Sequence, residues 1–514
     1  MIPLRASGVL LHPTSLPGPY GIGDLGQEAY YLVDFLVAAK QSLWQVLPLG
    51  PTGFGDSPYA SFSSHAGNPL LINLEMLAQE GDLLWTELSN VPAFPAERVD
   101  FGAVIDYKTK LLRQAARRFR ESGAGERRQA FEAFCAEKAH WLDDFALFMA
   151  LKDAHRGAPW NTWEIELIQR KPKALDRWRQ ELADEIFFFK YAQFQFFRQW
   201  AQVKRYANKR GIQIIGDIPI FVAPDSADAW ANPEIFYMDD HGRLTVVAGV
   251  PPDYFSPTGQ RWGNPLYRWD VLAADGYAWW IQRIRSVLEM VDILRIDHFR
   301  GFQDYWEIPA DEPTAVKGRW LPGPADDLFK ALRQALNGSP EGPLPIIAED
   351  LGIISDKVRA LRKRVGVPGM KVLHFAFSED ADHEYLPHNY EGSDYVVYLG
   401  THDNDTTIGW FNTLPPRERE FVLRYLGRDG SDIVWGMMHL AFMSIAQTVI
   451  VTVQDLLKLG SQARMNTPGT LGGNWTWRYW PGALYDGIAG WLGQLTETFG
   501  RAPKPRPEPR TDNG

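Results

Sequence analysis

Short apolar runs that end in polar, glycine or proline residues recur along the chain, and amphipathic helical stretches separate many of them. Continuous apolar runs of this length are typical of strands that are buried on both faces of a parallel sheet. Eight runs can be counted, which is the number that a closed (β/α)8 barrel requires. They begin near Ser7 and at Trp44, Ile212, Val291, Pro345, Met370, Tyr395 and, most weakly, Ala463.

We therefore predict an α/β fold, a (β/α)8 TIM barrel, whose single catalytic domain covers residues 1–500. An open doubly wound sheet is the alternative fold. It is disfavoured because no glycine-rich dinucleotide fingerprint follows any of the runs.

The runs are unevenly spaced, and the long gaps between them predict insertions. Residues 73–209 have mainly helical periodicity and should form a helical subdomain. Residues 223–270 are rich in proline, glycine, tryptophan and tyrosine, and we expect them to form a long loop that closes over the barrel mouth. After the eighth run only a helix near 483–499 is expected, with no separate C-terminal β-domain. The proline-rich tail, 501–514, is predicted to be disordered.

Composition narrows the possible partners. The formal net charge is -10, which argues against nucleic acid because phosphate binding needs a basic surface. The 20 Trp, 19 Tyr and 28 Phe could stack on sugars, although aromatic rings also fill ordinary cores.

Cys135 is the only cysteine, so no intramolecular disulfide can form. With no visible export signal or membrane-spanning run, we expect a cytoplasmic protein that does not bind membranes.

Four carboxylates stand at the ends of predicted strands: Asp217, Asp297, Glu349 and Asp403. In a barrel of parallel strands these ends meet at one mouth. A single carboxylate there is often a helix cap or an ion-pair partner, but four convergent ones repel one another and cost stability. Paired carboxylates suit glycosidic bond chemistry, in which one protonates the leaving oxygen and the other attacks or stabilises the sugar.

Arg295 precedes Asp297 by two residues, so both side chains should face the barrel interior. A neighbouring guanidinium would keep Asp297 ionised, as a nucleophile must be, although a purely structural pair stays open. Apolar residues before Glu349 favour a raised pKa and an acid/base role. His402 and Asp403 could both hold sugar hydroxyls.

A metal site is the main rival for these residues. His298 and His402 could bind a metal together with the carboxylates, but their spacing contains no compact ligand motif. We therefore predict neither a catalytic metal nor a cofactor, while a structural calcium site stays open.

Several segments around these residues resemble motifs of a known family. Residues 295–302, 348–352 and 400–406 closely resemble motifs of the amylomaltases, the 4-α-glucanotransferases of glycoside hydrolase family 77, which are relatives of the α-amylase group. Further matches occur in order along the chain, at 10–26, 56–61, 216–222, 251–265 and 463–470. The resemblance thus covers nearly the whole chain.

The resemblance implies a role for each site residue. Asp297 matches the nucleophile, Glu349 the acid/base and Asp403 the transition-state stabiliser. Tyr59 would stack on the sugar at the cleavage point. The other implied substrate contacts are Asp217, Asp253, Gln260, Trp262, Arg295, His298, His402 and Asn404, and the stretch 253–262 resembles a flexible loop that closes over the glucan.

The resemblance also implies retaining transfer of an α-1,4-glucan segment to the 4-hydroxyl of glucose or of another glucan. Expected partners are maltodextrin, amylose and glycogen-derived glucans, and a monomer is the default state. An α-1,4-glucan hydrolase with the same carboxylates is the alternative. A non-catalytic glucan-binding barrel is more remote, because such a relative should have lost one of the three carboxylates.

Overall fold

The protein is described by a computed structural model over residues 5–123, 125–252, 256–352, 354–378 and 380–504. Eight parallel strands form one sheet in the order β10-β11-β12-β1-β2-β3-β6-β9. Their bounds are β1 Ala6–Leu10, β2 Leu43–Gln45, β3 Gln213–Pro219, β6 Ile293–Asp297, β9 Ile346–Ala348, β10 Gly369–Val372, β11 Tyr395–Tyr398 and β12 Thr448–Thr452.

The two outer strands of this order, β9 and β10, also meet, so the sheet closes on itself. The Ala348 amide donates to the Pro368 carbonyl oxygen at 2.9 Å. The Asp350 carboxylate accepts from the Met370 amide at 2.7 Å, which ties the segment after β9 to β10. The predicted (β/α)8 barrel is therefore confirmed.

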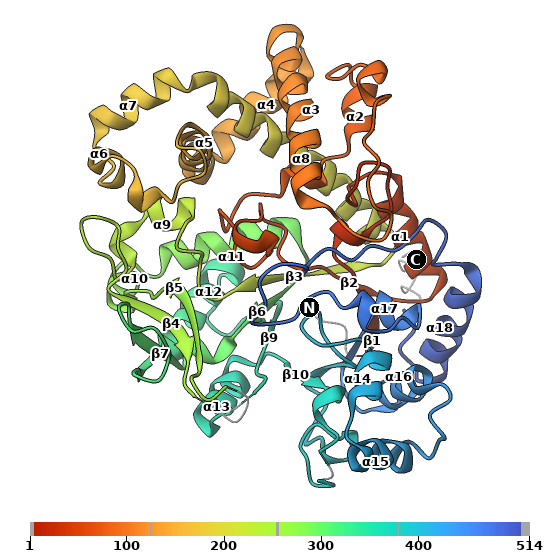
Figure 1. Cartoon of the computed structure of the whole chain (residues 1–514). Helices are drawn as coiled ribbons and strands as arrows, with labels where there is room; N and C mark the ends of the chain where they lie inside the picture. The colour runs from red at the N-terminus through yellow and green to blue at the C-terminus, as the bar shows by residue number, and fades with distance from the viewer. Residues whose placement is uncertain (1–4, 124, 253–255, 353, 379, 505–514) are drawn as a thin grey trace, which may run out of the picture.

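Helices cover the outside of the barrel (Figure 1). Most strand-to-strand connections contain at least one α-helix, as is usual for the long crossovers that parallel strands need. The covering helices are α1 Gln27–Ala38, α8 Ala183–Lys209, α11 Ala278–Met290, α12 Ala325–Asn337, α13 Asp356–Val365, α14 Thr407–Thr413, α15 Pro416–Leu426, α16 Ile433–Met443, α17 Val453–Leu456 and α18 Asp486–Thr498.

Side chains from every strand fill the barrel interior. The buried cluster contains Leu10, Leu43, Ile215, Ile293, Ile347, Met370, Val396 and Ile450, one from each of the eight strands. The centre is thus a packed core, and the open space lies at the strand ends.

Between β2 and β3 the chain leaves the barrel and forms a group of helices, which Figure 1 shows at the top of the molecule. Their bounds are α2 Leu74–Gln79, α3 Phe101–Ser122, α4 Glu126–Glu137, α5 Ala139–Ala154, α6 Ile165–Ile168 and α7 Pro172–Glu181, and they lead into α8. Apolar positions at helical spacing in α3, such as Leu111, Ala115 and Phe119, are buried.

The region expected to be an irregular loop, 223–270, is more ordered than predicted. It contains α9 Ala227–Ala231, β4 Val246–Val250, β5 Gln260–Pro265 and the start of α10 Trp269–Ala274. With β7 Asp304–Pro309 and β8 Arg319–Pro322, the strands form an antiparallel sheet in the order β5-β4-β7-β8. The prediction failed because β5 contains glycine and proline, and because β7, which pairs with β4, comes from a distant segment.

The eighth predicted strand was placed wrongly. Residues 463–470 contain no strand, and the eighth barrel strand is β12, which lies between β11 and β1. The run of residues 448–452 is entirely buried and consists only of β-branched residues, the composition that strands favour. Residues 466–469 instead carry Asn466, Pro468 and Gly469, which favour a turn.

The C-terminal helix is present as α18, but the chain after it remains ordered further than predicted. Arg501 is fully buried, and its guanidinium donates to the carbonyl oxygens of Phe442, Ala6 and Ser444. The expected disorder therefore does not begin at residue 501. The rest of the tail, 505–514, lies outside the described residues. Within the described ranges, no helix is long and apolar enough to cross a membrane.

Candidate active site

Two of the four carboxylates predicted to converge are held together by one arginine. Arg295 lies on β6, and its guanidinium donates to both oxygens of Asp217 on the adjacent strand β3, at 2.8 and 2.7 Å. The same guanidinium donates to Asp297 Oδ1 at 2.9 Å, as the two-residue spacing on one strand predicts. Arg295 therefore joins two acidic groups at the barrel mouth.

Burial differs sharply within this group. The side chains of Arg295 and Asp217 are 4% and 0% exposed, whereas that of Asp297 is 35% exposed. Burial raises the pKa of Asp217, and Arg295 acts against that shift. Burial alone would lower the pKa of Arg295, but Asp217 and Asp297 raise it well above its ordinary value. The arginine is thus a fixed cation, and the Asp297 side chain bound to it is partly exposed.

Glu349 follows β9 directly and is placed by two backbone amides. The amide of His298 donates to its Oε2 and the amide of Leu351 to its Oε1, both at 2.7 Å. Burial, followed by the nearby charge of Asp297, raises the pKa of Glu349 to about 7. The apolar residues before Glu349 predicted a shift in this direction. A carboxyl with such a pKa holds its proton in mildly acidic solution and can donate it.

Asp403 lies beyond the end of β11 and is held by the segment after β12. Asn466 Nδ2 donates to Asp403 Oδ1 at 2.6 Å, and Arg464 donates to the Asp403 backbone oxygen at 2.7 Å. The backbone N–H of Asn466 donates to the His402 carbonyl oxygen at 3.0 Å. Sequence reasoning missed Asn466 and Arg464 as individual site residues, although it singled out the segment 463–470 that contains them.

Three rings form one wall of the mouth. Tyr59 stacks on His402 with ring centroids 5.2 Å apart, and both rings contact Trp475. The Tyr59 hydroxyl donates to Asp217 Oδ2 at 2.8 Å. Trp475 was not predicted, because a lone tryptophan far along the chain gives no signal of this position.

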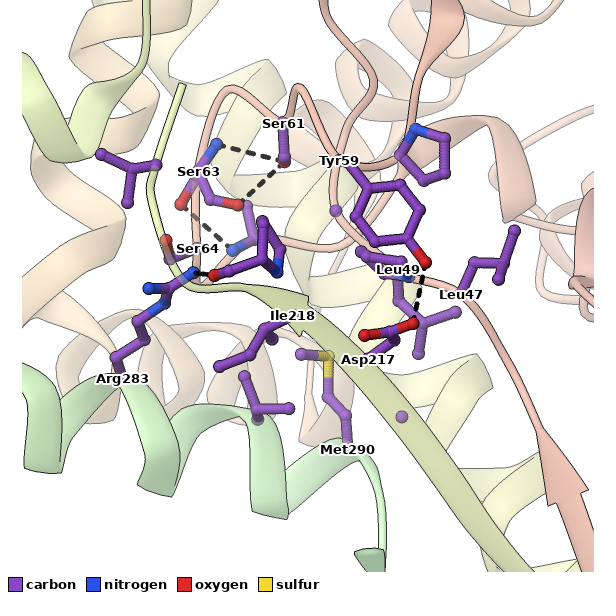
Figure 2. Close-up of a pocket in the computed structure, with 18 of the residues that line it drawn as sticks. Leu47, Leu49, Tyr59, Ser61, Ser63, Ser64, Asp217, Ile218, Arg283 and Met290 are labelled. Carbon is purple, nitrogen blue, oxygen red and sulfur yellow. Dashed lines mark hydrogen bonds between the residues drawn. The ribbon is translucent and has the colours of Figure 1, made fainter. Parts of the chain in front are cut away.

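A small pocket lies beside the Tyr59–Asp217 hydrogen bond (Figure 2). Its volume is about 40 Å³, which suffices for one or two water molecules. Ser61 and Ser63 line another part of it, and the Arg283 guanidinium lies at its far end. Most of the remaining lining is apolar, including Leu47, Leu49 and Ile218, and Asp217 from the end of β3 also lines the pocket.

His298, the residue after Asp297, contacts Trp262. Their rings contact edge to face at 4.8 Å, and Trp262 Nε1 donates to Gln260 Oε1 at 3.1 Å. His298 has a left-handed backbone, with φ of 54°, and burial lowers its pKa to about 3. In the described part of the chain nothing hydrogen-bonds its buried Nε2. A neutral imidazole with a free ring nitrogen at this position could bind a sugar hydroxyl.

Two predicted contacts stand apart from this group. The Asn404 side-chain oxygen accepts from the amide and hydroxyl of Thr401, so it shapes the loop that carries Asp403. Asp253 lies outside the described residues. The remaining predicted residues are joined by the contacts described above, and the exposed Gln260 accepts a hydrogen bond from Trp262.

The assembled site can carry out acid/base and nucleophilic chemistry on a neutral polyol. It offers one carboxylate beside a fixed cation, one carboxyl with a raised pKa, and aromatic rings for apolar sugar faces. Among the described residues, no three or more His, Cys, Asp or Glu side chains are grouped so that they could hold a metal ion.

Comparison with known proteins gives consistent matches. A family model described as 4-alpha-glucanotransferase, glycoside hydrolase family 77, matches residues 11–482. The 4-alpha-glucanotransferase of Thermus thermophilus is 54% identical over 487 residues, which are 93% of this chain and 96% of that protein. The one from Synechocystis sp. is 51% identical over 503 residues, 98% of this chain and 99% of that protein. The solved structure of amylomaltase from Streptococcus agalactiae in complex with acarbose has a TM-score of 0.93 and 40% identity, covering 97% of this chain and 100% of that chain.

Proposed function

The chain belongs to the 4-alpha-glucanotransferase family, glycoside hydrolase family 77, and we propose that Asp297, Glu349 and Asp403 carry out its reaction. As a member of this family it is a glycosyltransferase that acts on α-1,4-glucans. The observation that carries the proposed roles is the contrast between two carboxyl groups at one barrel mouth. Asp297 is bound to a buried cation, whereas Glu349 has a pKa of about 7.

In the first step an oxygen of Asp297 attacks the anomeric carbon of the donor glucan. The bond from that carbon to the leaving oxygen breaks, and Glu349 gives its proton to the leaving oxygen. In the second step the 4-hydroxyl of an acceptor gives its proton to Glu349 and attacks the same carbon, which releases Asp297. Two inversions give net retention, and this requires carboxyl groups about 5–5.5 Å apart.

Asp403 stabilises the positive charge that develops on the sugar in both steps, and Asn466 holds it in position. Tyr59 and His402 supply a flat surface for the sugar at the cleavage point. Asp217, Arg295, His298 and Asn404 are proposed as further contacts, and Gln260 and Trp262 as contacts from the closing segment. Asp253 has the same proposed role, which rests on the resemblance of its segment.

Transfer requires that water be excluded while the acceptor binds. We assign this role to residues 223–270 as a lid, whose Trp262 contacts His298 beside the nucleophile. The division into a barrel, a helical insertion at 73–209 and this lid is part of the same proposal. Donors are maltodextrins and related glucans, glucose is the simplest acceptor, and a single cysteine suits a cytoplasmic location.

The test is incubation with maltotriose, with the products resolved by chain length. A transferase yields glucose and a ladder of longer maltodextrins with little net gain in reducing ends. Glucose and maltose with rising reducing ends would instead show a hydrolase, and binding without conversion would show a glucan-binding barrel. Asp297→Asn should abolish transfer while it leaves glucan binding, and near-normal transfer in that variant would overturn its role.

A further inference from the structure

A second aromatic pocket lies on the outside of the barrel, between α16 and α18. It is lined by Trp435 and Val434 from the start of α16, by Trp491 from α18, and by the Asp432–Lys458 ion pair. Its volume is about 320 Å³, within the usual range of small-molecule sites. None of these residues takes part in the reaction proposed above.

The lining combines flat rings with polar groups at their edge. The rings of Trp435 and Trp491 contact edge to face with centroids 5.5 Å apart, and both side chains are partly exposed. Lys458 Nζ donates to Asp432 Oδ2 at 2.6 Å, and Asp432 Oδ1 accepts from the Trp435 amide at 3.2 Å. A lysine ammonium has three N–H groups, so Lys458 can donate to Asp432 and to a ligand at the same time.

The charges of this pocket indicate which class of ligand it fits. Asp432 and Lys458 are 42% and 49% exposed, and their opposite charges balance each other. A balanced pair does not select an anion or a cation, but it can both accept from and donate to hydroxyl groups. An aromatic surface beside such a pair suits a neutral sugar, which has apolar C–H faces and a rim of hydroxyls.

The pocket lies at the same end of the barrel as the catalytic carboxylates. Helix α16 leads into β12, so its first turn stands where the barrel strands end, and Lys458 follows β12 and α17 at that end. From Lys458 the chain continues through Ser461, which donates to Asp405 at 2.7 Å, to Asn466, which donates to Asp403. One short segment therefore connects the pocket to the active site.

We propose that the pocket between α16 and α18 is a second binding site for α-1,4-glucan chains. It would hold a remote part of a long chain while another part occupies the catalytic mouth. Two contacts on one polymer raise its affinity by effective concentration, whereas a trisaccharide occupies one site at a time. This inference rests on the proposed function, because it takes the same substrate class.

The test compares long and short glucans in the Asp297→Asn background, where binding is not complicated by turnover. Affinity for amylose is measured by retardation in gels that contain the polymer, and affinity for maltotriose by calorimetry. Adding Trp491→Ala should weaken amylose binding about tenfold, the size of one aromatic stacking contact, and leave maltotriose binding unchanged. Tyr31→Ala serves as the control, because Tyr31 is a 55% exposed ring on the neighbouring helix α1.

Lys458→Ala is the second test variant, since loss of an exposed ion pair leaves the fold nearly unaffected. It should also weaken amylose binding selectively, even if Trp491→Ala proves to unfold. Amylose affinity within twofold of the parent in Lys458→Ala and in folded Trp491→Ala overturns the second site. A different result would overturn the proposed function: transfer activity that persists in Asp297→Asn.

Discussion

Replacing Arg295 by methionine should separate the structural cost of the buried charges from their chemical role. Arg295 makes three hydrogen bonds to carboxylate oxygens at 2.7 to 2.9 Å, and its side chain is 4% exposed. Removing one partner of a buried ion pair costs about 3–5 kcal/mol, because the other charge is left uncompensated. Arg295→Met should therefore lower the free energy of unfolding by about that amount and strongly reduce transfer.

A second substitution distinguishes the two effects. In Arg295→Met/Asp217→Asn the uncompensated buried carboxylate is gone, and the side-chain oxygen of the introduced asparagine can still accept from Tyr59. Stability should recover by roughly half or more, since the largest part of the penalty is the lone charge. Activity should not recover, because Asp297 still lacks its cation.

The measurement is urea unfolding followed by tryptophan fluorescence, together with transfer from maltotriose. Arg295 also lowers the pKa of Glu349, so residual activity of the single variant should have its alkaline limit displaced upward. The reasoning is refuted if Arg295→Met costs less than about 1 kcal/mol, or if the double variant is as unstable as the single one.

Three further predictions concern the same site. Glu349 must be protonated to act as an acid and has a folded pKa of about 7, so kcat/KM should fall tenfold per pH unit above pH 7; a limb near pH 4.5 would contradict the assignment. Asn466→Ala removes the 2.6 Å hydrogen bond to Asp403 and should lower kcat by about 10- to 100-fold with little change in KM, the reverse of a simple binding contact. Trp262→Ala should raise the ratio of hydrolysis to transfer, measured as reducing ends gained per glucose released; an unchanged ratio counts against the lid.

The barrel could be predicted because its strands are continuous apolar runs with polar ends. Seven of the eight were located from this pattern, and the closing strand was misplaced. The β-branched run at 448–452 has the composition of a strand. The segment 463–470 was predicted instead, and it contains a family motif but no strand. A motif can mark a functional loop as well as a strand, and here Asn466 serves the site from a loop.

The contacts between site residues were harder to predict than the identity of those residues. The Arg295–Asp297 contact follows from strand periodicity, and the raised pKa of Glu349 follows from its apolar neighbours. Contacts between distant segments, such as Tyr59 with Asp217 or Asn466 with Asp403, depend on how the closed barrel brings loops together. No local pattern carries that information.

The antiparallel sheet β5-β4-β7-β8 also depends on contacts between distant segments, which local patterns do not predict. Its strands come from two segments on either side of β6, and β5 lacks the alternation that marks a half-buried strand. The structure of β5 depends on its pairing with β4, which in turn pairs with the distant β7, so sequence alone favoured a loop.

The central claim is that Asp297 forms a covalent bond to the sugar and Glu349 moves the proton. The most direct measurement is the mass of peptides from Glu349→Gln after reaction with an α-maltosyl fluoride. Fluoride leaves without an acid, so the glycosyl-enzyme can form, but without a base its transfer to an acceptor is slow. The account predicts a maltosyl group on the peptide that contains Asp297. An unmodified Asp297 peptide, with maltose released in the β configuration, would show a single inverting displacement and contradict it.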